Sequence, residues 1–211
     1  MENLLGVILC GGESKRMGAD KGLLPIRNTI WAKHMHEKLA MFHLPVVYSV
    51  NEQQVHTYVE EISPELLVVD NAEVEGPLKG LLSVHQQYPG KDLLLLACDM
   101  LDLDAGSIDH LLREYMRDNQ FDFYVYQDVD FAQPFCGIYT QTGLEKVAGR
   151  IMIGRLKNYS LQAIFDEGCT QRLAMRSQHV FRNYNSNADI EAYFEHPVIP
   201  TVPGNSNRLT G

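Results

Sequence analysis

The chain has 211 residues and a formal net charge of −9, and 45% of its residues are hydrophobic. This length suits one α/β domain with a sizeable core. The acidic balance argues against a general nucleic-acid-binding surface, which needs a basic face, but a few placed cations can still hold a phosphate. The four cysteines, Cys10, Cys98, Cys136 and Cys169, lack C-x-x-C spacing. We therefore expect reduced thiols in a cytoplasmic protein, without disulfides or a structural zinc site.

The apolar runs in the sequence are too short to span a membrane. The first, residues 4–10, lacks a basic leader, so we expect a strand there and no secretory signal. The run at 93–98 is far shorter than the roughly 20 residues that a transmembrane helix needs. From His196 onward the chain is rich in proline and polar residues and has no periodicity. Residues 1–195 are thus predicted to form a single domain, and residues 196–211 a disordered tail.

Strand-like and helical patterns alternate along the chain. Apolar runs predict strands at residues 4–10, 45–50, 66–69, 93–98, 121–126, 135–139 and 180–184. Helical spacing predicts helices at 31–42, 52–61, 78–85, 108–116, 144–147, 161–165 and 190–194. This alternation predicts an α/β fold, a three-layer, Rossmann-like, mostly parallel twisted sheet with helices on both faces and right-handed crossovers.

A glycine-rich loop follows the first predicted strand, with the sequence L-C-G-G-E-S-K-R-M-G-A-D-K at residues 9–21. In open α/β sheets, ligands bind at the carboxyl ends of the strands. Gly11 and Gly12 allow backbone N–H groups to approach a ligand, and Arg16 and Lys21 add positive charge. This combination fits a polyphosphate. The spacing matches neither a Walker loop nor a dinucleotide-binding glycine motif.

The pattern G-G-x-S-x-R-M-G-x-D-K-x-L-L at residues 11–24 closely resembles the sugar-nucleotide-pyrophosphorylase-like nucleotidyltransferases, and within them the molybdenum cofactor guanylyltransferases. Further segments similar to motifs of this family are Asn51, V-V-D at 68–70, G-P-L-K-G-L at 76–81, C-D-M at 98–100, Q-P-F-C-G-I-Y at 133–139 and N-Y-N-S at 183–186. The likeness covers residues 4–193. It departs at Cys10, where alanine is usual, at Leu101, where proline is usual, and at Asn28-Thr29.

The resemblance implies a nucleotide-diphospho-sugar transferase-like fold and a Mg²⁺-dependent nucleotidyltransferase. It implies transfer of GMP from GTP to the terminal phosphate of Mo-molybdopterin, with release of pyrophosphate. The residues expected to be catalytic are Arg16, Lys21 and Asp99. Those expected to bind the nucleotide are Leu9, Cys10, Gly11, Gly12, Lys21, Asn51, Asp70, Gly80 and Asp99. The expected metal ligands are Asp99 and Asn185.

The chemistry of this transfer agrees with these residue types. A phosphate monoester has a second pKa of about 6, so the acceptor is mostly dianionic at neutral pH and needs no enzyme base. The enzyme must then supply alignment and charge neutralisation. Asp99 follows the most apolar strand and is placed to hold Mg²⁺. Asn51 either contacts the base or caps the following helix, and Asp70 either lies near the nucleotide or is a solvated turn residue.

Several alternatives stay open at this point. The pair Gly11-Gly12 is kept in guanylyl members of the family, whereas close cytidylyl relatives carry an early alanine, and this favours GTP. The alternatives are CTP-dependent transfer to the same or another phosphate acceptor, such as a sugar phosphate or methylerythritol phosphate, and a nucleotide-binding protein without catalysis. The resemblance also implies contacts with other molybdenum cofactor biosynthesis proteins. We expect a monomer or a weak homo-oligomer, with neither nucleic acid nor membrane as a partner.

Overall fold

The structure is a computed structural model that describes residues 2–11, 20–129, 131–175, 177–185, 189 and 191. Gly12, Arg16, the tail at 196–211 and nearly all of the helix predicted at 190–194 lie outside the described residues. Within the described ranges, no helix is both long enough and apolar enough to cross a membrane.

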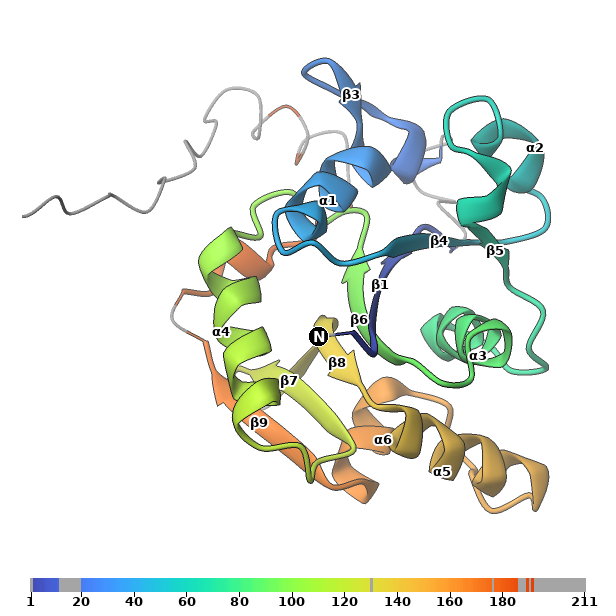
Figure 1. Cartoon of the computed structure of the whole chain (residues 1–211), viewed down its shortest axis with the longest axis vertical. Coiled ribbons are helices and arrows are strands. Elements are labelled where there is room, and N and C mark those ends of the chain that lie inside the picture. Colours follow the sequence, from blue (N-terminus) through green and yellow to red (C-terminus); the bar gives the residue numbers. More distant parts are fainter. Residues whose placement is uncertain are drawn as a thin grey trace, which may run out of the picture.

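A seven-stranded sheet forms the middle layer of the molecule, with the order β5-β4-β1-β6-β8-β7-β9 (Figure 1). The strands are β1 (Leu4–Leu9), β4 (Val46–Val50), β5 (Leu67–Val69), β6 (Asp92–Ala97), β7 (Phe123–Gln127), β8 (Ala132–Tyr139) and β9 (Thr170–Ala174). Neighbouring strands pair in parallel, except that β8 runs antiparallel between β6 and β7. The predicted mostly parallel sheet is confirmed.

Helices cover both faces of this sheet (Figure 1). One face carries α1 (Trp31–Ala40) and α4 (Ala105–Arg117), and the other carries α3 (Pro77–Gln87), α5 (Gln141–Met152) and α6 (Leu161–Glu167). A single helical turn, α2 (Val55–Tyr58), follows β4, and a short hairpin of β2 (Pro25–Ile26) and β3 (Thr29–Ile30) precedes α1. The three-layer architecture agrees with the prediction.

The strands read as continuous apolar runs because both sheet faces are buried. In β1, Leu4 and Ile8 join the core cluster on the α1 face, while Leu5 and Val7 join the cluster on the α3 face. Side chains alternate between the two faces of a strand, so a strand covered on both sides needs an apolar residue at every position.

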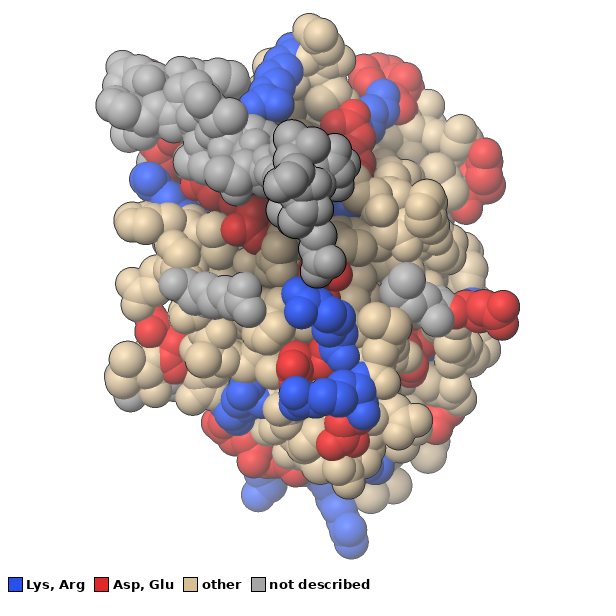
Figure 2. Space-filling model, turned by 60° about the vertical axis from the view of Figure 1, so that its left-hand side comes forward, with Lys and Arg blue, Asp and Glu red and all other residues tan. Residues whose placement is uncertain are grey.

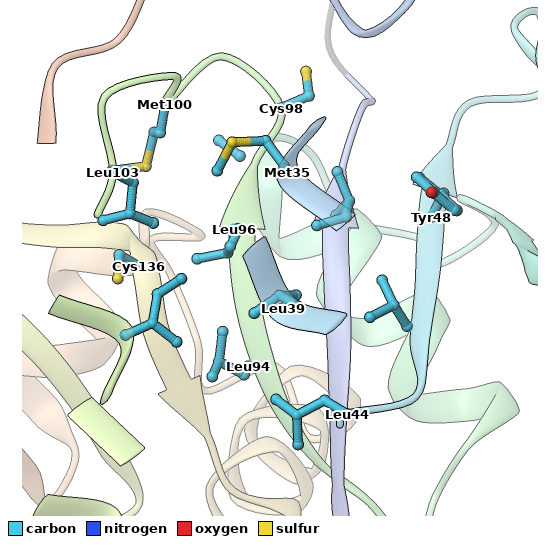
Figure 3. Packing of buried hydrophobic residues seen from close by; sticks show 14 of the residues in the cluster. Met35, Leu39, Leu44, Tyr48, Leu94, Leu96, Cys98, Met100, Leu103 and Cys136 are labelled. Carbon is cyan, nitrogen blue, oxygen red and sulfur yellow. The ribbon is translucent and has the colours of Figure 1, made fainter. Parts of the chain in front are cut away.

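The α1 face shows how the core fixes the strand ends. Met35 and Leu39 of α1 lie over Leu94 and Leu96 of β6 (Figure 3), and all four side chains are fully buried. Burying such a side chain contributes about 1.5–3 kcal/mol. Cys98 lies at the end of the same stack, where β6 leaves the core. The residues that follow β6 therefore start from a rigid position.

The outer surface carries charges of both signs. Figure 2 brings the side of α4 and β9 forward and shows Lys and Arg interspersed with Asp and Glu. On α4, Arg113 pairs with Asp109 and Arg117 pairs with Glu114, each at 2.5 Å. Exposed pairs of this kind contribute up to about 1 kcal/mol each.

Two predicted elements were wrong. Residues 180–184 are not a strand, since His179–Phe181 forms a 3-10 turn, and the last strand within the described residues is β9. In β9 the sole fully buried residue is Leu173, as is typical of an edge strand, so no apolar alternation marks it. The aromatic residues of the segment 180–184 pack individually instead, with Phe181 against Tyr126 and Tyr184 against Trp31. The helix predicted at 52–61 is reduced to the single turn of α2.

Candidate functional site

A pocket opens at the carboxyl ends of β1 and β6. Six residues predicted from the sequence line it, namely Leu9, Cys10, Gly11, Lys21, Asp99 and Asn185. Five further residues complete the lining, namely Pro77, Ala97, Cys98, Phe135 and Asn183. Phe135 and Asn183 belong to segments that resemble family motifs, but their place in the pocket was not predicted. The pocket lies on the edge of the sheet where open α/β folds bind ligands.

One lysine joins three distant parts of the chain in this pocket. The ammonium of Lys21 donates to Asp99 Oδ2 at 2.8 Å and to Asn185 Oδ1 at 2.5 Å. These partners lie 78 and 164 residues away in sequence. The Lys21 and Asp99 side chains are each only 16% exposed. A partly buried ion pair is screened less by salt than a surface pair. The attraction between Lys21 and Asp99 is therefore stronger than that of an exposed pair.

The same geometry tests whether the residues suit a magnesium ion. Asp99 and Asn185 offer one carboxylate and one amide oxygen, and both oxygens already converge on a single cation, the Lys21 ammonium. Magnesium favours oxygen ligands, keeps several waters and is commonly held by one or two protein ligands plus substrate phosphate. Among the described residues, no three His, Cys, Asp or Glu side chains gather as a metal cage. The donor set therefore fits Mg²⁺ held together with a phosphate.

The loop that carries Asp99 is fixed from two sides. From α1, the Lys38 ammonium donates to the carbonyl oxygens of Leu101 and Leu103, each at 2.6 Å. From the other side, the Tyr184 backbone N–H donates to the Asp99 carbonyl at 3.1 Å. Burial lowers the pKa of Lys38 to about 8, although the negative charges of the nearby carboxylates act to raise it. This role of Lys38 could not be predicted from the sequence, because the residue lies in an ordinary helical pattern.

Asp70 lies beside the start of the glycine-rich loop. Its Oδ1 accepts a hydrogen bond from the Ser49 hydroxyl at 2.6 Å, and a Cβ on Gly11 would lie 2.5 Å from its Oδ2. Burial raises the pKa of Asp70 to about 6, and the Ser49 hydrogen bond partly opposes this shift. Asp70 is thus a partly buried carboxylate under Gly11, and the alternative of a solvated turn residue is wrong.

Replacing Asp70 by Asn is expected to change how stability depends on pH. Because the folded-state pKa is raised to about 6 from 3.8, the stability that protonated Asp70 contributes is lost as pH rises from about 4 through 6. Asn stays neutral, so the variant should gain about 1–3 kcal/mol over the wild type between pH 4 and pH 7. Urea unfolding across this range measures the difference. The exposed Asp109→Asn is the control, and a D70N curve parallel to the wild type would contradict the assignment.

Gly80 is required by packing. It lies on α3, and a Cβ there would sit 2.4 Å from Ser49 Oγ and 2.6 Å from Leu9 Cδ1. The helix therefore approaches β1 and β4 closely beneath the pocket. Gly80 does not itself line the pocket as described, so its contact with a nucleotide stays a prediction.

The substitution Gly80→Ala is expected to destabilise the protein by about 1–3 kcal/mol through overpacking. Gly149 on α5 offers a matched control, because a Cβ there meets no atom within 4 Å. Gly149→Ala should stabilise the helix by up to about 1 kcal/mol. Urea midpoints of both variants give the comparison. Equal midpoints would contradict the close approach at Gly80.

Asn51 caps the turn that leads into α2. Its Oδ1 accepts from the Gln54 backbone N–H at 3.1 Å, and its own N–H donates to Gln54 Oε1 at 2.9 Å. The spacing N-x-x-Q is that of a capping box, and it could have been recognised in the sequence. The cap is thus confirmed, while contact of Asn51 with a base stays a prediction.

The thiols of Cys10 and Cys98 lie side by side at the ends of β1 and β6. Both are buried, and a hydrogen bond to Cys10 together with burial raises the pKa of Cys98. A thiol with a raised pKa is a poor nucleophile. The interpretation of these residues as buried thiols is therefore supported.

The mostly parallel sheet, with a lysine, a carboxylate and an amide gathered in a pocket at its carboxyl edge, defines an α/β protein with a ligand site where such folds bind nucleotides and phosphates. Residues 6–168 match the family described as MobA-like NTP transferase domain, and the chain belongs to this family.

Similar proteins extend this result. The chain is 32% identical over 142 residues to a molybdenum cofactor biosynthesis bifunctional protein of Synechocystis sp., over 67% of this chain and 40% of that protein. It is 29% identical to a molybdenum cofactor guanylyltransferase of Shewanella sediminis, over 54% of this chain and 57% of that protein. The chain thus spans less than two thirds of the length of each of these two relatives.

Solved structures share the fold. Molybdopterin-guanine dinucleotide biosynthesis protein A from Archaeoglobus fulgidus superposes with a TM-score of 0.73 at 16% identity, over 91% of this chain and 97% of that one. A cytidylyltransferase from Leptospira borgpetersenii gives a TM-score of 0.65 at 19% identity, over 90% and 83%. The predicted nucleotide-diphospho-sugar transferase-like fold is confirmed.

Proposed function

We propose that this nucleotidyltransferase transfers GMP from GTP to the terminal phosphate of Mo-molybdopterin and releases pyrophosphate. The observation that carries the proposal is the convergence of Lys21, Asp99 and Asn185 on one point of the pocket. The names of several relatives, which are molybdenum cofactor guanylyltransferases, support the acceptor and the base.

The residues of the pocket have separate tasks in this reaction. An oxygen of the acceptor phosphate forms the new bond to the α-phosphorus of GTP, and the bond to the β-phosphate oxygen breaks. Negative charge builds on the leaving pyrophosphate, and the Lys21 ammonium is placed to neutralise it. The backbone N–H of Gly11 is not free to bind phosphate as expected from the sequence, because it donates to Ser49 O at 3.1 Å. A side chain at position 11 would clash with Asp70, because a Cβ there would lie 2.5 Å from its Oδ2.

Magnesium would be held by Asp99 and Asn185 together with phosphate oxygens of the nucleotide. When bound, it supplies positive charge across the phosphates. Lys21 now occupies the point where the two protein oxygens meet. Its ammonium would therefore neutralise phosphate charge at the same point of the pocket.

The acceptor binds on the side of Phe135 and Asn183 in this proposal. Phe135 belongs to β8, the antiparallel strand next to β6, and Asn183 precedes the residue whose N–H is bonded to Asp99 O. Both residues line the pocket. An aromatic ring and an amide suit an acceptor that combines a flat ring system with polar edges.

The test combines purified protein, Mg²⁺ and Mo-molybdopterin with GTP or CTP, and measures pyrophosphate release. Release with GTP that exceeds release with CTP is expected. Thermal shifts with each triphosphate provide a second measurement, because a ligand that binds the folded state raises the melting temperature. Faster release with CTP would replace GTP by CTP as donor, and GTP binding without any pyrophosphate release would favour a nucleotide-binding protein without catalysis.

A further inference from the structure

Gln54, the N-cap residue of α2, contacts both ends of the glycine-rich loop. The side-chain amide of Gln54 donates through Nε2 to the carbonyl of Cys10 at 3.1 Å, where β1 ends. The same nitrogen donates to Asp20 Oδ2 at 2.5 Å, where the described chain resumes after the loop. Gln54 is only 9% exposed. One buried amide thus joins the two ends of residues 11–20.

Asp20 is held by two further donors. Its Oδ1 accepts from the Tyr58 hydroxyl at 2.9 Å and from the Gly22 backbone N–H at 3.0 Å. Tyr58 is fully buried, and a Cβ on Gly22 would lie 2.1 Å from the Tyr58 hydroxyl oxygen. A glycine is therefore needed beside Lys21 for this approach. The residue before Lys21 is fixed by three hydrogen bonds from two directions.

The orientation of the Gln54 amide is itself determined by its partners. Its Oε1 accepts from the Asn51 backbone N–H at 2.9 Å, so its NH₂ group faces Cys10 and Asp20. The position requires one acceptor and two donors on the same planar group. A primary amide supplies this combination and a carboxylate does not.

We propose that Gln54 is a positioning residue for nucleotide transfer, which holds the two ends of the glycine-rich loop together and so sets Lys21 at Asp99 and Asn185. The inference rests on the proposed function only for its catalytic consequence. The hydrogen-bond network itself is independent of the donor base and of the acceptor. A small misplacement of a positioned charge is enough to lower turnover strongly.

The test is Gln54→Glu, compared with Gln53→Glu as a matched control. Gln53 is the neighbouring residue of the same type and is exposed. Both changes add one carboxylate to the turn before α2. At position 54 it would face the Asp20 carboxylate, with the Tyr58 hydroxyl and the Cys10 and Cys98 thiols as the other titratable neighbours. At pH 8 we expect kcat to fall at least about tenfold in Q54E and to change less than about twofold in Q53E.

Lowering the pH should restore Q54E relative to the wild type. Two facing carboxylates share a proton as pH falls, because one of them has a raised pKa, and a protonated Glu can again donate to Asp20. The ratio of kcat in Q54E to kcat in the wild type should therefore rise between pH 8 and pH 6. A merely structural loss would not show this recovery. A constant ratio, or equal activity in the two Glu variants, would overturn the proposal.

A second readout does not require turnover. Lys15 and Arg16 lie between the two joined ends and are trypsin cleavage sites. Cleavage there should be faster in Q54E than in Q53E at pH 8. Tyr58→Phe removes one donor to Asp20 while it keeps the packing, and it should shift both readouts in the same direction by less.

These readouts separate the two proposals. A cleavage difference in a protein whose wild type releases no pyrophosphate from GTP would overturn the proposed function and leave the role of Gln54 intact. Wild-type activity combined with equal cleavage and equal kcat in Q54E and Q53E would do the reverse. If Q54E fails to fold, Y58F decides, since unchanged cleavage and activity in Y58F would count against the role of the network.

Discussion

Replacing Asp99 by Asn is expected to lower kcat about 10²–10³-fold while nucleotide binding weakens much less. Asp99 brings the one carboxylate among the described residues that line the pocket, and it is the ion-pair partner of Lys21 at 2.8 Å. An amide keeps the shape and can still accept from the Lys21 ammonium, so the protein should fold normally. What is lost is the negative charge that would hold Mg²⁺ on the phosphates.

The measurement for Asp99→Asn is pyrophosphate release under saturating GTP and Mg²⁺, with the binding of GTP followed by thermal shift. Asp109→Asn on α4 is the matched control, because its carboxylate is 49% exposed and contacts only Arg113 among the interactions described. A variant D99N that keeps full turnover, or one that needs no more Mg²⁺ than the wild type, would exclude a metal role for Asp99.

Replacing Lys21 by Met is expected to lower kcat by a similar factor, about 10²–10³. Met preserves most of the apolar stem, so the loss reports the ammonium. Lys21→Arg should not restore activity, because a planar guanidinium does not reproduce the compact point charge that the ammonium brings to the phosphates. The exposed Lys157→Met is the matched control.

Lys21 and Asp99 should also show coupled effects. Because the two groups contact each other and act on the same phosphates, the double variant K21M/D99N should lose far less than the product of the single losses. Pyrophosphate release from all four proteins completes the cycle. Independent, multiplicative losses would show that the two residues do not act at one point, against the geometry of the pocket.

The sequence by itself determined six of the seven strands of the central sheet and the position of the glycine-rich loop after the first of them. Strands buried on both faces need apolar residues at every position, so β1 and β6 are visible as continuous runs. The loop can be recognised because its glycines and charged residues stand at the spacing of a long family motif. The capping pair of Asn51 and Gln54 also obeys a local rule, although its link to the loop does not.

The tertiary structure decided which residues from distant parts of the chain meet, and local sequence patterns do not specify this. Lys21, Asp99 and Asn185 meet only because β1 pairs with β6 and because Tyr184 bonds the loop after β6. Strand order is set by contacts between residues far apart in sequence, which no window of neighbouring residues reports. The same reason explains β9, an edge strand that exists through its pairing with β7 rather than through its own apolar pattern. It also explains Lys38 and Gln54, whose partners lie in other segments and whose roles appear only when those segments are brought together.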